Sequence, residues 1–192
     1  MECRMYTNGL KEDRGGDTAD PRRQWLQVEF SYFLRSYLQS KAFMQDAYLL
    51  DAYQQVLEAL QHWARIVIIE EGLEPEQMVW AQVRRVNPGV HKLYEEITSN
   101  EESLEQRVKL VLLACEFAIM SKMESCCSVL LDVIRSRPEP WSLQDLSEKP
   151  ELRDLKLDLP VLMAKMSRKE LVREVAVSAD DSLLLELKYT VC

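Results

Sequence analysis

The chain contains few of the residues from which phosphate-binding and catalytic sites are commonly built. Its 192 residues include only 5 Gly and 2 His, and they form neither a G-x-G-x-x-G loop nor a G-x-x-x-x-G-K-[ST] loop. The two common backbone cradles for phosphate are therefore excluded, and two histidines limit the available acid–base and metal chemistry. We predict no catalytic residues, no resident metal and no cofactor in this chain, and we interpret it as an accessory binding module.

The chain also lacks cysteine-pair motifs, a net positive charge and long apolar runs. The 5 Cys are an odd number without CxxC spacing, which argues against a disulfide framework or a zinc site and favours buried free thiols. No apolar run approaches the roughly 18 residues of a membrane span, and the polar residues 1–17 lack the apolar core of a signal peptide. We therefore expect a cytoplasmic protein without a membrane partner. The formal net charge of -8 disfavours nucleic acid as a main partner.

Apolar residues recur at helical spacing over most of the chain, which predicts a mainly α fold. Asp20 followed by Pro21 is typical of a helix start, and Gly72 of a helix end. The expected helices span about 20–38, 42–71, 75–86, 90–97 and 103–135. Long helices joined by short loops predict an up-and-down bundle over residues 20–137. The polar residues 1–19 are expected to be a disordered lead-in.

The segment Arg137-Pro138-Glu139-Pro140 predicts a linker, because two prolines exclude a helix. Beyond it we expect short helices from Ser142 and over 159–166, followed by alternating strands with a turn at 179–182. Val175 and Val177 are predicted to face Leu185, Leu187, Tyr189 and Val191 across this hairpin. The pattern predicts a winged-helix domain with a C-terminal β-hairpin at 138–192, after a bundle domain at 20–137.

Several stretches together resemble a known family. They are SKAF at 40–43, LDAYQQVLEALQHWARIVIIEEG at 50–72, VWAQVRRVNPGVHKLYEE at 79–96, LLACEFAI at 112–119 and PWS at 140–142. Over about 24–192 the chain resembles the C-terminal two-thirds of the YgxA-like nucleotidyltransferase proteins of spore-forming bacteria. The resemblance implies a helical domain of the nucleotidyltransferase substrate-binding type, then a winged helix, with a nucleotidyltransferase domain ahead of both.

The motif that performs nucleotidyl transfer is missing from the sequence. Polymerase-type transfer needs a Gly-Ser turn for the triphosphate and a D-x-[DE] carboxylate pair for metal ions. Gly15-Gly16-Asp17 lacks the serine, and no D-x-[DE] pair follows. We expect no transfer by this chain alone. Magnesium and a nucleoside triphosphate would belong to a catalytic domain, which we expect as the partner, in the same chain or in another.

Two polar groups on the predicted helices are candidates for substrate binding. His62 and Arg65 share one face of the second helix, where they can form the rim of a pocket for an anion. Trp80, Arg84 and His91 follow, and an indole with a guanidinium can hold a base or a sugar phosphate. We predict that all five side chains face one concavity. The competing interpretations are a structural histidine with an ion pair, and a tryptophan that belongs to the core.

Glu116 lies inside the apolar run VLLACEFAIM, where a carboxylate needs a partner. Arg65 is the predicted partner, and the alternative is that Glu116 faces solvent. Arg85 and His91 are spaced like the R-x4-6-H element of HEPN ribonucleases, but a Pro-Gly pair interrupts them.

Lys165, Arg168 and Lys169 cluster at the end of the predicted recognition helix, which is a pattern for DNA contact. Against this, residues 141–192 carry eight Lys and Arg but ten Asp and Glu. The function that we predict is therefore a non-catalytic substrate-binding module that shapes a pocket against a nucleotidyltransferase domain. The alternative is a winged-helix transcriptional regulator with the bundle as its dimerisation or sensor domain. A homodimer is compatible with either.

Overall fold

The computed structural model describes residues 20–99, 101–178 and 185–192, so the predicted lead-in at 1–19 lies outside the described residues. Over the described part the chain is mainly helical, with a two-stranded antiparallel sheet near its C-terminus. This confirms the predicted fold class. The elements are α1 (Pro21–Gln45), α2 (Leu49–Glu70), α3 (Val79–Val86), α4 (Pro88–Ser99), α5 (Leu104–Cys126), α6 (Ser128–Arg135), α7 (Leu143–Ser147), η1 (Pro150–Leu155), α8 (Leu159–Arg168), β1 (Val172–Ser178) and β2 (Leu185–Val191).

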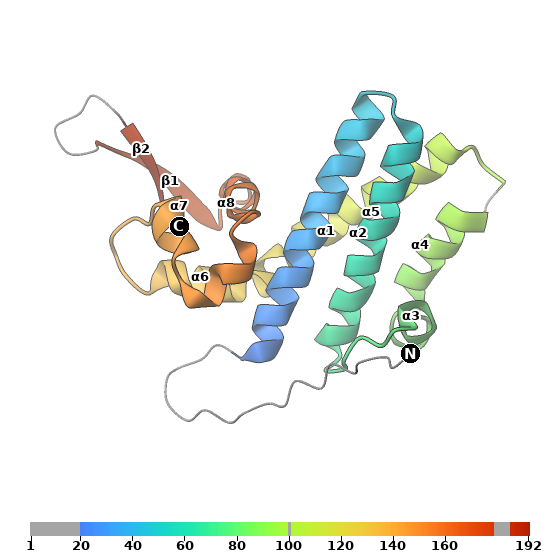
Figure 1. The fold of residues 1–192 in the computed structure, drawn as a ribbon, viewed down its shortest axis with the longest axis horizontal. Coiled ribbons are helices and arrows are strands. Elements are labelled where there is room, and N and C mark those ends of the chain that lie inside the picture. The colour runs from blue at the N-terminus through green and yellow to red at the C-terminus, as the bar shows by residue number, and fades with distance from the viewer. Residues whose placement is uncertain (1–19, 100, 179–184) are drawn as a thin grey trace, which may run out of the picture.

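Two long antiparallel helices form the centre of the bundle. Figure 1 shows α1 and α2 side by side, with α5 behind them, α3 and α4 beyond α2, and the C-terminal elements beyond α1. Helix α1 begins where predicted, because the Asp20 side chain accepts a hydrogen bond from the backbone N–H of Arg22 and Pro21 follows it. Phe33 is fully buried between the two helices and stacks on Trp63, with 5.7 Å between ring centroids.

Two of the predicted helix starts are wrong. The second helix begins at Leu49 and not near residue 42, because α1 continues to Gln45 and the chain turns at Ala47, whose φ is 62°. The third begins at Val79 and not at residue 75. There the buried Gln82 side chain donates to the carbonyl of Glu74 and accepts from the backbone N–H of Glu76, which holds this segment as a loop.

The predicted long fifth helix is two helices, α5 and α6, separated at Cys127. No side chain of its own caps α6. Instead the buried Gln27 side chain, from α1, accepts a hydrogen bond of 2.8 Å from the backbone N–H of Leu130. A distant residue thus satisfies one of the unpaired N–H groups of the new helix start. Because α6 also packs against β2, it is part of the winged-helix arrangement.

The winged helix follows the order α6, extended segment, α7, η1, α8, β1, β2. The extended segment is at Trp141, which exchanges two backbone hydrogen bonds with Tyr189 of β2, at 2.7 and 2.8 Å. Helix α7 begins with the predicted capping box, in which Ser142 and Asp145 each accept a hydrogen bond from the other's backbone N–H. The wing is therefore joined to the segment that follows α6.

The prediction that Val175 and Val177 share a face of the hairpin with Leu187 is wrong. Val175 pairs with Lys188 and Val177 pairs with Glu186, whereas Leu187 pairs with Ala176. Side chains directly opposite each other in an antiparallel pair share a face, so the two valines lie on the face opposite Leu187. The predicted turn at 179–182 lies outside the described residues.

One continuous hydrophobic core joins the bundle to the winged helix. It extends from buried residues of α1 and α5 through α6 to α8 and the hairpin. Polar contacts cross the same junction, because Arg35 of α1 pairs with Asp158 at the start of α8, and Arg23 pairs with Asp132 of α6. A smaller core lies between α2, α3 and α4. Among the helices of the described part of the chain, none is long and apolar enough to cross a membrane.

Candidate functional site

A buried carboxylate is the centre of the polar group on α1 and α2. The Glu29 side chain is only 5% exposed. Its Oε2 lies 2.7 Å from Nδ1 of His62, and its Oε1 accepts a hydrogen bond of 3.3 Å from Nη1 of Arg65. An ionised carboxylate is only an acceptor, so His62 donates through Nδ1 and a neutral imidazole then carries its lone pair on Nε2. Glu29 therefore fixes the orientation of both predicted site residues.

The same polar face continues along α1 towards the winged helix. The Tyr32 and His62 rings are in contact, with 5.3 Å between centroids. The guanidinium of Arg35 lies 4.9 Å from the centre of the Tyr32 ring, and its Nη1 lies 3.2 Å from Asp158. Arg35 and Arg65 are both partly exposed. This face therefore presents two guanidinium groups that can donate hydrogen bonds to an anion, and an imidazole whose Nε2 can accept one.

The predicted pair of Arg65 with Glu116 is wrong. Arg65 pairs with Glu29, and Glu116 is 48% exposed and lies 3.6 Å from Nζ of Lys41 on α1. The alternative, that Glu116 faces solvent, describes its position better. Glu29 was not predicted from the sequence, although, like Glu116, it is a carboxylate within an apolar stretch, WLQVEFSYFL.

The other predicted site residues form a second group on α3 and α4. Trp80 stacks on Tyr94, with 4.0 Å between ring centroids and 17° between ring planes. Arg84 is exposed, and Nδ1 of His91 lies 3.5 Å from a carboxylate oxygen of Glu95. Trp80 also packs against both cores, so part of its ring has a structural role. That the five residues face one concavity stays a prediction.

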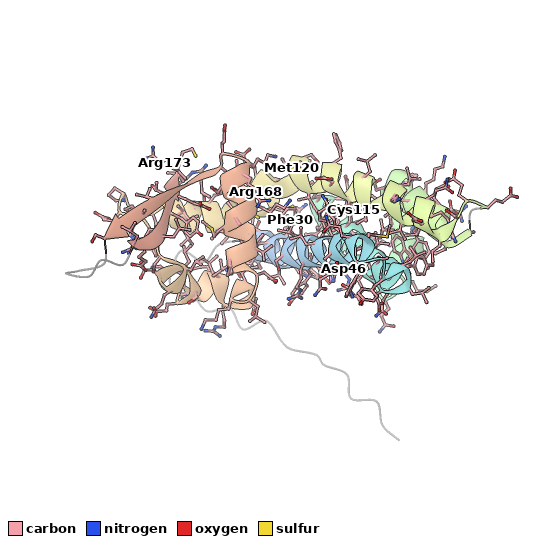
Figure 2. The ribbon with its side chains drawn as sticks, turned by 90° about the horizontal axis from the view of Figure 1, so that it is seen from above. Phe30, Asp46, Cys115, Met120, Arg168 and Arg173 are labelled. Atoms are coloured by element: carbon pink, nitrogen blue, oxygen red, sulfur yellow. The ribbon has the colours of Figure 1, made fainter. Side chains whose placement is uncertain are left out.

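The predicted DNA-contact residues lie near the C-terminal end of α8, at Lys165, Arg168 and Lys169. Figure 2 labels Arg168, the last residue of α8, and Arg173, near the start of β1. Helix-turn-helix proteins contact base edges mainly with the N-terminal residues of the recognition helix. In this chain that end is packed against α1, because the buried Asp158 pairs with Arg35.

A family model described as the YgxA-like substrate binding domain matches residues 23–122, which is more than half of the chain. The chain belongs to the YgxA-like family. A second model, described as a helix-turn-helix domain, matches residues 128–191. These matches confirm the predicted resemblance. The helix-turn-helix match starts at Ser128, the first residue of α6, whereas the division at 137/138 stays a prediction.

Two relatives of this YgxA-like chain extend the comparison. The "Uncharacterized protein YgxA" of Bacillus subtilis (strain 168) is 37% identical over 169 residues, which are 88% of this chain and 57% of the relative. The crystal structure of a nucleotidyltransferase-like protein from Exiguobacterium sibiricum 255-15 matches with a TM-score of 0.83 and 34% identity, over 88% of this chain and 59% of that chain. The chain thus spans less than two thirds of the length of either relative.

Replacing Glu29 by alanine should lower the free energy of unfolding by about 2 kcal/mol, because His62 and Arg65 lose their buried acceptor. Both partners are partly exposed, so water compensates some of the loss. Urea unfolding followed by circular dichroism at neutral pH measures the change. Glu58→Ala, at an exposed position of α2, is the matched control and should have little effect. Equal effects of the two substitutions would show that the buried pair does not stabilise the fold.

Proposed function

We propose that this chain is a non-catalytic substrate-binding module that works with a nucleotidyltransferase catalytic domain. The observation that carries the proposal is the Glu29–His62–Arg65 group, which lies within the residues matched by the YgxA-like substrate binding domain. The likeness to a nucleotidyltransferase-like protein supports the choice of partner. The catalytic domain is either part of a longer protein or a separate chain.

The geometry suits a substrate with an anionic or strongly polar group. Glu29 holds His62 and Arg65 in place, so that fewer rotamers must be fixed when a ligand binds. Arg65 and Arg35 supply charge-assisted hydrogen bonds, which are the strong contacts to phosphate or carboxylate. The stacked pair of Trp80 and Tyr94, with Arg84 nearby on α3, offers a second contact surface for a planar ring.

Metal chemistry is assigned to the catalytic domain. The described residues bring together no group of three or more His, Cys, Asp or Glu side chains that could hold a metal ion. We propose that the partner binds magnesium and the triphosphate, and that this module orients the second substrate. A module of this kind forms only one wall of the pocket, so we expect nucleotides to bind to it alone in the millimolar range or not at all.

The helix-turn-helix match favours a second candidate function, that of a transcriptional regulator. A basic group at Lys165, Arg168 and Lys169 supports it. The packing of the start of α8 against α1 supports instead a role in protein contact, because the usual base-reading end is covered. We therefore propose that the winged helix stabilises the module.

The test joins residues 20–192 to the part of Bacillus subtilis YgxA that the chain does not match. Label from α-labelled nucleoside triphosphates should pass, with magnesium, into a small-molecule extract. Arg65→Ala and Arg84→Ala should each lower this transfer about tenfold, the effect of losing one charge-assisted hydrogen bond. Arg153→Ala, at an exposed position of η1, is the control.

Two results would contradict the proposal. If the joined protein transfers no label from any of the triphosphates, the catalytic partner is wrong. If Arg65→Ala transfers as well as the Arg153→Ala control, the assigned substrate face is wrong.

A further inference from the structure

Helix α5 carries apolar side chains on two sides. One side packs into the bundle through Val111, Cys115 and Ile119, which are buried. The other side exposes four large apolar side chains, which we call the apolar stripe: Leu110, Leu113, Phe117 and Met120. Figure 2 shows Met120 at the outer edge of α5 and Cys115 on its side towards α1. Phe117 is 77% exposed and Leu113 is 68% exposed, which is a large apolar surface to leave in water.

The charged residues next to the apolar stripe are engaged within the chain. Glu116 lies beside the stripe but pairs with Lys41 of α1. Lys109 lies on the same side of the stripe and pairs with Glu105, one turn earlier on α5. Both charges thus have an opposite charge beside them, and the four residues of the stripe are all apolar. The outer side of α5 therefore has the character of an interface core.

The spacing of the apolar stripe is symmetric. Its four residues are separated by three, four and three positions, so the pattern reads the same in both chain directions. This is the a and d pattern of a heptad, by which one helix packs along another. A two-fold axis perpendicular to α5 brings the apolar stripe of one copy against the stripe of the second copy, with the chain directions reversed. We infer that α5 is the interface of an antiparallel homodimer, with Leu113 against Phe117 and Leu110 against Met120 of the second copy.

The polar residues at the two ends of the apolar stripe distinguish antiparallel from parallel packing. Gln106 precedes Leu110 by one turn, and the exposed Glu124 follows Met120 by one turn. Oε1 of Gln106 accepts hydrogen bonds from Ser103, at 3.2 Å from its backbone N and 2.8 Å from its Oγ, which leaves the amide Nε2 as a donor. Antiparallel packing places this donor at the Glu124 carboxylate of the second copy. Parallel packing would place two Glu124 carboxylates together, which is unfavourable.

The proposed dimer is independent of the proposed function. The stripe lies on α5, whereas the substrate face is built from Glu29 of α1 and two residues of α2. A single pair of helices over about three turns buries less surface than a standard interface of roughly 1,600 Å², so we expect micromolar affinity. A different partner on the same surface would leave the chain monomeric in isolation.

Sedimentation equilibrium of the full chain from about 5 to about 200 µM tests the proposal, because a micromolar dimer forms within this range. We expect the wild type to reach the dimer mass and Phe117→Glu to weaken dimerisation at least tenfold. Leu113→Asn is a second, milder variant. Leu157→Glu, at an apolar residue that is 86% exposed outside α5, is the matched control and should dimerise like the wild type. A wild type that stays monomeric, or a Phe117→Glu variant that dimerises normally, overturns the interface.

Disulfide trapping tests the direction of packing. In a Cys3→Ser/Cys192→Ser background, Leu113→Cys and Phe117→Cys chains with tags of different size are mixed and oxidised. The antiparallel arrangement predicts the mixed disulfide in preference to either disulfide between identical chains. Disulfides between identical chains in excess would overturn the antiparallel register.

Discussion

Raising the pH from 9 to 10.5 should lower the free energy of unfolding by about 6 kcal/mol, which is comparable to the roughly 5–15 kcal/mol of a whole domain. The main cause is three buried thiols, at Cys115, Cys126 and Cys127, and Tyr37 adds a smaller part because burial raises its pKa as well. Burial raises the pKa of the Cys126 thiol to about 12, helped by the nearby carboxylate of Glu70. Burial also raises the pKa values of Cys115 and Cys127 well above the ordinary 9.0.

The direction follows from the protons that each state binds. Above pH 9 the thiols of the unfolded chain lose their protons, whereas those of the folded chain keep them. The unfolded state then binds fewer protons, so stability falls by about 1.4 kcal/mol per pH unit for each thiol. Below pH 9 both states are protonated, and this contribution is constant.

Urea unfolding in the presence of a reductant, at intervals between pH 8 and 10.5, measures this slope. The double variant Cys126→Ala/Cys127→Ala should be less stable at pH 8, because two small cavities form, but should lose less than half as much stability on going to high pH, because Cys115 and Tyr37 remain. Cys192→Ala removes an exposed thiol and should keep the wild-type slope. A double variant with the wild-type slope would show that other groups cause the alkaline instability.

Replacing Trp141 by alanine should lower the free energy of unfolding by about 4 kcal/mol, the usual effect of removing a buried large aromatic. Its side chain is 3% exposed, and its Nε1 donates a hydrogen bond of 3.2 Å to the carbonyl of Ile134. The guanidinium of Arg137 lies 3.7 Å from the ring centre, and Nζ of Lys149 lies 4.9 Å from it. The substitution therefore removes a core contact and two cation–π contacts together.

The matched control for Trp141 is Trp25→Ala, since Trp25 is 39% exposed on α1 and should lower stability by less than about 1 kcal/mol. Far-ultraviolet circular dichroism in urea measures both variants without relying on tryptophan fluorescence. A Trp141→Ala variant as stable as Trp25→Ala would mean that the ring does not hold the wing to α6.

Local signals in the sequence predicted the elements whose ends are determined by neighbouring residues. Asp20 with Pro21 marks the start of α1, and Ser142 with Asp145 forms the capping box of α7. The order of short helices followed by alternating strands was enough to predict the winged helix. In each case the hydrogen bonds that decide the boundary join residues within a few positions of each other.

Contacts between distant residues could not be predicted in the same way. Glu29 is separated by 33 positions from His62, so their pairing depends on how α1 and α2 align. The break at Cys127 has no proline or glycine, and its cap, Gln27, comes from 103 positions away. The strand register depends on which face of the hairpin meets the core, so alternation alone left Val175 and Val177 on the wrong side.

The hydrogen bond from the backbone N–H of Leu130 to the Gln27 side chain limits which fragments of the chain can fold alone. The first family match ends at residue 122 and the second starts at residue 128, which suggests two separable domains. A fragment that ends at residue 122 would leave the Gln27 side chain without its partner and uncover the apolar side of α1 that meets α6. A fragment that starts at residue 128 would begin with an uncapped helix. We therefore expect neither matched segment to fold alone, and we expect the smallest fragment that folds to extend from α1 to β2.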